Sequence, residues 1–114
     1  MERLREVVRQ ELRDVGWLVT SKDALKFGAH FLLYRPPTPH SIVAVLIFED
    51  VEEFTFLEAQ RFSRLCETVG KTALVIVPKD EGLRYISIDR WTPHISLRVL
   101  SFKKENMLRQ FQVR

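Results

Sequence analysis

The stretch KFGAHFLLYRPPTPHS, residues 26–41, places a glycine turn, an apolar run and a proline-rich loop next to one another. Phe31 to Tyr34 is rich in strand-forming residues, and a second such run follows at residues 42–48. The segment RPPTPHS joins the two runs, and its three prolines make it stiff. The pattern predicts two neighbouring strands, with Tyr34 ending the first and His40 just before the second.

Upstream of this stretch the sequence predicts a helix, a short strand and a turn. Apolar side chains recur within residues 2–14 at the spacing of one helix face: Leu4, Val7, Val8 and Leu12. Gly16 suits the end of that helix. Residues 17–19 then read as a short strand and residues 21–26 as a turn.

Downstream, helical spacing returns over residues 54–69, where Phe62, Leu65 and Val69 are expected to face the core. Gly70 is expected to end this helix. Residues 72–77 are almost continuously apolar and predict a buried strand.

The C-terminal third predicts further strands. PKDEG reads as a turn, and LRYISIDRW alternates as the next strand should. ISLRVLSF is consistent with one more strand, and KKENMLRQFQVR with a short helix or a loose tail. The predicted fold class is therefore α/β, a small mixed sheet flanked by helices.

Composition restricts the class of protein. The chain has 114 residues, 46% hydrophobic and 29% charged, and carries a net charge of +3, which permits a nucleic-acid partner without demonstrating one. A lone cysteine, Cys66, excludes an intrachain disulfide and favours a reducing compartment. The charged beginning MERLREVVRQELRD predicts no signal peptide, and no apolar run is long enough to span a bilayer. We expect a cytoplasmic protein with no membrane partner.

Three side chains are candidates for chemistry because of where they stand: Tyr34, His40 and Lys71, the last at the mouth of a buried strand. Each has an ordinary structural interpretation, as a core tyrosine with a wet hydroxyl, a loop histidine and a charge complementing a helix end. Together they suit metal-free RNA cleavage, which needs a base for the ribose 2′-hydroxyl, an acid for the leaving 5′-oxygen and a cation for the charge on phosphorus. The three histidines are scattered, without carboxylates at metal-ligand spacing, so no metal site is predicted.

Three segments in this order carry a family resemblance: GWLVTSKDALKFGAHFLLYRPPTPHS, RFSRLCETVGKTALVIV and LRYISIDRW. They resemble the C-terminal catalytic domain of the tRNA-splicing endonucleases, the tRNA-intron endonuclease family, over about residues 4–91. The resemblance implies that family's restriction-endonuclease-like arrangement in one domain over residues 1–114, with residues 92–114 as a C-terminal strand and tail.

The resemblance also implies a function. It makes Tyr34 the general base, His40 the general acid and Lys71 the charge-stabilising residue. The implied reaction is cleavage of a precursor tRNA at its two exon–intron junctions, in bulge-helix-bulge RNA. It leaves a 2′,3′-cyclic phosphate and a 5′-hydroxyl and uses neither a metal nor another cofactor.

Further residues acquire expected roles from the same resemblance. Arg64 and Arg90 match positions that grip a flipped bulge base, although surface arginines also cover apolar neighbours. Asp80 and Glu81 occupy a turn that docks in a basic cleft of another subunit, although solubility alone also favours an acidic turn.

Several departures from the family pattern leave the role of the chain open. His30 stands where the pattern normally has an aspartate, the loop between Tyr34 and His40 is short, and Gly70 replaces a common arginine. We also expect the chain to lack the N-terminal domain of many archaeal members. These departures slightly favour a structural subunit over a catalytic one. We expect the chain to work with a companion subunit in a hetero-oligomer, or otherwise in a homo-oligomer. A non-enzymatic RNA-binding or scaffold domain is the third alternative.

Overall fold

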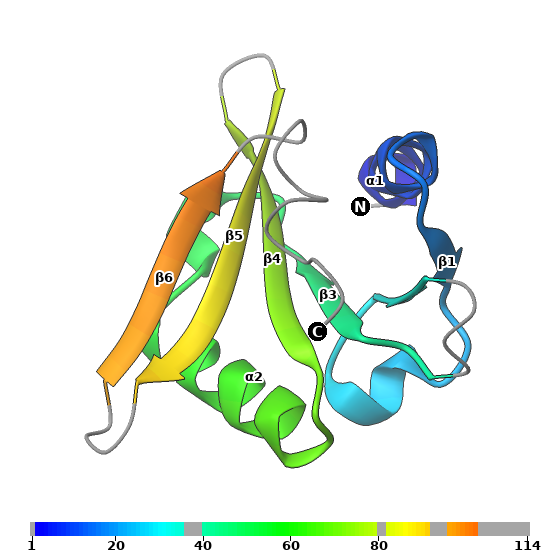
Figure 1. Ribbon diagram of the computed structural model, residues 1–114. Coiled ribbons are helices and arrows are strands. Elements are labelled where there is room, and N and C mark those ends of the chain that lie inside the picture. Colours follow the sequence, from blue (N-terminus) through cyan, green and yellow to red (C-terminus); the bar gives the residue numbers. More distant parts are fainter. Residues whose placement is uncertain (1, 36–39, 80–81, 92–95, 103–114) are drawn as a thin grey trace.

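The computed structural model describes residues 2–35, 40–79, 82–91 and 96–102. They form a mixed sheet with one long helix on each side, which confirms the predicted α/β class (Figure 1). The sheet follows the chain order β1-β2-β3-β4-β5-β6. Its strands are β1 (Leu18–Thr20), β2 (Phe31–Tyr34), β3 (Val43–Ile47), β4 (Thr72–Lys79), β5 (Gly82–Trp91) and β6 (Ser96–Phe102).

One pair of strands gives the sheet its mixed character. β3 and β4 run parallel, whereas the other neighbouring strands are antiparallel. Parallel neighbours require a crossover connection, and helix α2 (Phe56–Thr68) supplies it. The connection brings the beginnings of β3 and β4 to the same edge of the sheet.

Helix α1 (Glu2–Asp14) covers one face of the sheet. Val8 and Leu12 are fully buried there, against a cluster that includes Phe31 of β2. Tyr85 of β5 also donates a hydrogen bond from its hydroxyl to the Glu11 carboxylate at 3.3 Å. The helix has the bounds that the apolar spacing predicted.

Helix α2 covers the opposite face, but it buries different residues from those expected. The side chains it buries are Ala59, Phe62, Ser63 and Cys66. Leu65 and Val69 are 38% and 41% exposed, so their predicted burial was wrong. Small side chains let the helix approach the sheet closely, and the spacing of the larger apolar residues does not reveal which small residues are buried.

The remaining boundaries differ slightly from the sequence predictions. The second helix begins at Phe56, because the Thr55 hydroxyl accepts a hydrogen bond from the Glu58 N–H at 3.2 Å and caps it. The predicted turn at residues 21–26 runs into a short 3₁₀ helix, η1 (Ala24–Phe27), and another, η2 (Val51–Glu53), precedes α2.

The C-terminal strands are present as β5 and β6, so residues 95–102 were rightly expected to contain a strand. The predicted tail, residues 103–114, lies outside the described residues. No helix in the described ranges is long and apolar enough to cross a membrane.

Candidate functional site

Three strand ends meet at one edge of the sheet, namely the edge that runs across the strands, where β2 ends and β3 and β4 begin. The end of β2 lies beside the start of β3, where Leu33 pairs with Val43, and Val43 in turn pairs with Thr72 at the start of β4. The Ile42 N–H donates to the Leu33 carbonyl at 3.0 Å, and the Thr72 N–H donates to the Ile42 carbonyl at 2.9 Å. Tyr34, His40 and Lys71 each lie within three residues of these paired positions, so the sheet register brings the three sequence candidates to one edge.

Lys71 is held at this edge by both its backbone and its side chain. Its backbone N–H donates to the Cys66 carbonyl at the end of α2, at 2.8 Å. Its half-buried ammonium donates to the Ser41 carbonyl at 2.9 Å. Since Ser41 directly follows His40, this bond links the lysine to the segment that carries the histidine.

The lysine also lies against an aromatic ring. The Lys71 Nζ atom is 5.2 Å from the centroid of the Phe27 ring, within the range of a cation–π interaction.

The positive charge of Lys71 also acts on the thiol of Cys66. Burial raises the pKa of the Cys66 thiol to about 12, and the positive charge of Lys71 opposes that rise. Cys66 is therefore a neutral core thiol at physiological pH and not a nucleophile.

Tyr34 and His40 differ in exposure. Tyr34 is half-buried and packs on the α2 side of the sheet, against the cluster that contains Phe62 and Cys66. His40 is exposed and precedes the buried Ser41. This exposure leaves the His40 ring accessible to a bound substrate.

The structure gives less detail for the two candidate RNA-binding arginines, Arg64 and Arg90. Arg64 is an exposed residue of α2, and its carbonyl accepts a hydrogen bond from the Thr68 hydroxyl at 2.9 Å. Arg90 lies in β5 opposite Leu97 of β6, but its side chain is outside the described residues. The structure therefore leaves Arg64 accessible without bringing it into contact with Lys71.

Asp80 and Glu81, the expected docking residues, lie outside the described residues. They fall between Lys79 and Gly82, which pair where β4 turns back into β5. Since Lys71 directly precedes β4, the pairing of Lys79 and Gly82 lies at the other end of that strand from the candidate site.

His30 has a role at the start of β2 that the sequence did not reveal. Its backbone N–H donates to the Val45 carbonyl at 2.7 Å, and its ring Nδ1 accepts a hydrogen bond from the Ile47 N–H at 2.9 Å. Burial lowers the pKa of His30, and the charge of Arg5 lowers it further. Nδ1 is joined to Cγ, as an aspartate carboxylate oxygen is, so His30 retains a hydrogen-bond acceptor where the family pattern has an aspartate.

Because the neutral His30 ring accepts this hydrogen bond, we expect the free energy of unfolding of the chain to depend on pH. Because the folded-state pKa of His30 is lowered, the unfolded chain takes up the proton first, and stability should fall as pH drops from about 6.5 towards the folded-state pKa. In His30→Asn, the amide oxygen can accept from Ile47 without titrating. Urea unfolding at pH 7.5 and 5.5 should show a smaller loss of stability for the variant than for the wild type. The same loss in both proteins would refute the role of His30.

Among the described residues, no group of three or more His, Cys, Asp or Glu side chains could hold a metal ion. The side chains at the candidate edge are instead a phenol, an imidazole and an ammonium. The phenol, once ionised to the phenolate, can accept a proton, the protonated imidazole can donate one, and the ammonium can stabilise negative charge.

Comparison with known proteins identifies the family of this arrangement. The family model for the tRNA intron endonuclease, catalytic C-terminal domain, matches residues 3–85, a range that contains all three candidates. A tRNA-splicing endonuclease of Methanococcoides burtonii is 37% identical over 92 residues, which cover 76% of this chain and 26% of the relative. One from Pyrococcus furiosus is 31% identical over 90 residues, which cover 78% of this chain and 51% of the relative.

The matched region spans about half of the Pyrococcus relative and about a quarter of the Methanococcoides relative. The family match, in contrast, covers most of this chain and includes the strand ends where Tyr34, His40 and Lys71 lie. The chain therefore belongs to the tRNA intron endonuclease family, by its match to the catalytic C-terminal domain.

Proposed function

We propose that the chain is a catalytic subunit of an endonuclease that cleaves precursor tRNA at exon–intron junctions. Family membership supports a role in tRNA splicing. The observation that carries the finer proposal is the hydrogen bond from the Lys71 ammonium to the Ser41 carbonyl. It holds a positive charge beside His40, at the edge where the strand bearing Tyr34 ends.

The proposed reaction is an internal transesterification of RNA. Tyr34 in its phenolate form accepts the proton of the ribose 2′-hydroxyl, whose oxygen forms a bond to the adjacent phosphorus. The bond from phosphorus to the 5′-oxygen breaks, and His40 in its imidazolium form donates a proton to that oxygen. Lys71 stabilises the negative charge that develops on the phosphoryl oxygens. The products are a 2′,3′-cyclic phosphate and a 5′-hydroxyl, and no water or redox partner is consumed.

Two of the departures from the family pattern, His30 and Gly70, are compatible with a catalytic subunit once their places in the fold are considered. His30 provides an acceptor where the aspartate would stand. Gly70 has a φ of 72°, a left-handed conformation that strains other residues, so a glycine there suits the end of α2. The short loop still favours the structural alternative, in which a companion subunit performs the cleavage.

A second subunit remains part of the proposal. β6 is the last strand in the order of the described sheet and pairs with β5, and we propose that its other edge pairs with a strand of another chain. We also propose that Asp80 and Glu81 dock in a basic cleft of that subunit and that the assembly works in the cytoplasm.

The test is single-turnover cleavage of a bulge-containing precursor tRNA by the chain, alone and with a longer family member as companion. The proposal predicts cleavage at both junctions, with 2′,3′-cyclic phosphate and 5′-hydroxyl ends. RNA binding without cleavage under both conditions would support the scaffold alternative. Cleavage that depends only on residues of the companion would support the structural one.

Arg64 gives a prediction about RNA affinity. If its guanidinium stacks on a base of the bulge, Arg64→Ala should weaken binding of precursor tRNA by roughly five- to thirtyfold, the scale of one lost stacking contact. Arg61→Ala is the matched control, because Arg61 is an exposed arginine one turn earlier on α2. Equal effects of the two substitutions in a filter-binding titration would mean that Arg64 contributes charge alone.

A further inference from the structure

We infer that Phe27 is a positioning residue for Lys71, a role that rests on the proposed function of Lys71 in stabilising charge on the phosphate. The Lys71 ammonium lies over the Phe27 ring at 5.2 Å and donates to the Ser41 carbonyl at 2.9 Å. Both contacts act on the same nitrogen. They come from two segments of the chain, η1 and the segment before β3.

The two contacts restrict where the charge can lie. A lysine ammonium has three N–H donors on a flexible four-carbon stem. The Ser41 carbonyl takes one donor, and the electron-rich ring face attracts the cation from another direction. The remaining N–H groups are left for an anion. A charge already fixed where negative charge develops stabilises the transition state without the cost of ordering the side chain during the reaction.

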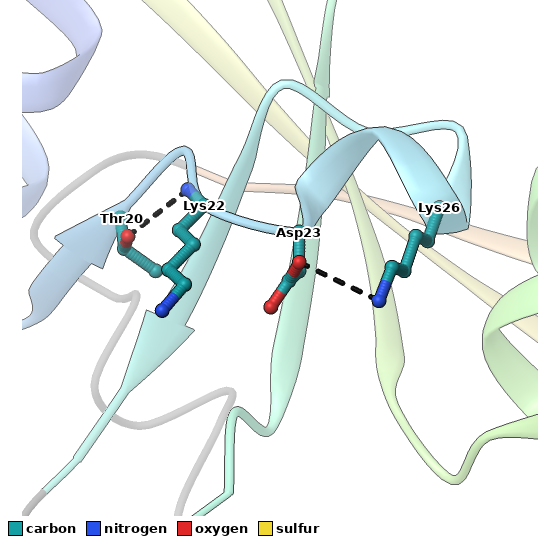
Figure 2. A network of polar contacts seen from close by, with 4 residues as sticks. All are labelled: Thr20, Lys22, Asp23 and Lys26. Carbon is teal, nitrogen blue, oxygen red and sulfur yellow. Dashed lines mark hydrogen bonds and ion pairs between the residues drawn. The ribbon is translucent and has the colours of Figure 1, made fainter.

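Phe27 is itself held in place by a short, tightly bounded helix. Asp23 precedes η1 with a φ of 63°, and Gly28 follows it with a φ of 64°. Figure 2 shows the polar contacts at its start, where the Lys26 ammonium pairs with the Asp23 carboxylate at 3.5 Å and the Lys22 N–H donates to the Thr20 hydroxyl at 3.1 Å. The left-handed turns at both ends fix the path of η1 and so the place of the ring.

A simple packing role is the alternative, because Phe27 also packs partly buried against the cluster on the α2 side of the sheet. The two roles predict different substitution patterns. Packing alone is satisfied by an aliphatic side chain of similar size. A cation–π contact requires an aromatic ring, so tyrosine should replace phenylalanine and leucine should not.

The experiment compares Phe27→Leu and Phe27→Tyr in single-turnover cleavage at saturating protein. Phe27→Leu should lower the cleavage rate by roughly five- to thirtyfold with the Kd for RNA within about twofold, because the contact orders the charge and does not bind the substrate. Phe27→Tyr should retain a rate within about threefold of wild type. Phe56→Leu, at a phenylalanine that is 65% exposed on α2, is the matched control and should leave the rate unchanged.

A double-mutant cycle separates this inference from the proposed function. In a Lys71→Met protein, Phe27→Leu should cause no further loss, because its only catalytic effect passes through the ammonium. The same fractional loss with and without Lys71 would overturn the inference. If Lys71→Met alone leaves cleavage unchanged, the proposed function fails and the inference fails with it. If Lys71→Met slows cleavage and Phe27→Leu does not, only the inference fails.

A measurement without RNA applies even if Phe27→Leu does not fold. In the NMR spectrum of the wild-type protein, the ε-methylene protons of Lys71 should resonate upfield of those of the other lysines, since they are one bond from the Nζ atom that lies over the Phe27 ring. An unshifted Lys71 resonance would overturn the inference. In a folded Phe27→Leu protein the upfield shift should be lost, and its persistence would also count against Phe27.

Discussion

His40→Ala should slow single-turnover cleavage of precursor tRNA by a factor on the order of 10² to 10⁴, the range expected for a lost general acid. His40 is exposed and directly precedes Ser41, whose carbonyl accepts the Lys71 hydrogen bond. The proposed role of its ring is to protonate the departing 5′-oxygen. RNA affinity should change little, because the proton transfer belongs to the transition state and not to substrate binding.

A modified substrate makes this prediction specific to the acid role. A sulfur atom in place of the 5′-oxygen at one junction is a better leaving group and needs no proton. His40→Ala should therefore cleave this substrate within about tenfold of the wild-type rate. Lys71→Met is the matched control, because the loss of a positive charge is not repaired by a better leaving group. An equally large defect of His40→Ala on both substrates would contradict the acid role of His40.

Lys71→Met should reduce the cleavage rate by a factor on the order of 10² to 10³, the effect of removing one group that stabilises an oxyanion. Methionine keeps the apolar stem but removes both the charge and the hydrogen bond to the Ser41 carbonyl. Lys71 is half-buried, and its ammonium contacts both the Ser41 carbonyl and the Phe27 ring. Among the described residues, no other lysine makes this pair of contacts.

The control for Lys71 is Lys22→Met. Lys22 is an exposed lysine of the turn before η1, and its substitution removes an equal charge. It should leave the cleavage rate within about twofold of wild type, with a modest effect on RNA affinity. If both variants lose rate equally, the effect of Lys71 is general electrostatic attraction and not stabilisation of the transition state.

The sequence predicted most of the fold because its signals were local. The apolar run at residues 31–34 is β2 as predicted, and the apolar spacing of residues 2–14 gave the bounds of α1. The buried face of α2 was assigned wrongly, since it is made largely of small residues whose burial depends on the close approach of the sheet. The distance between α2 and the sheet cannot be predicted from the local amino-acid composition of the helix.

For the candidate site, the sequence predicted that three residues lie near neighbouring strand ends, but it did not predict their contacts. The positions of Tyr34, His40 and Lys71 along the chain were enough to place them at one edge of the sheet. The contacts of Lys71 with Phe27 and with the Ser41 carbonyl depend on how η1 and α2 pack on the sheet. The hydrogen bond from Ile47 to His30 likewise joins residues 17 apart in sequence, so it follows from strand pairing and not from a motif.

The most direct test of the central claim is single-turnover cleavage of precursor tRNA by a triple variant, Tyr34→Phe with His40→Ala and Lys71→Met, assembled with the same companion as the wild type. Sedimentation and RNA titration on the same samples establish that assembly and binding are intact. The catalytic account predicts loss of cleavage by a factor on the order of 10⁴ or more, with RNA affinity preserved. Cleavage within about twofold of the wild-type rate would contradict it and assign the chemistry to another subunit.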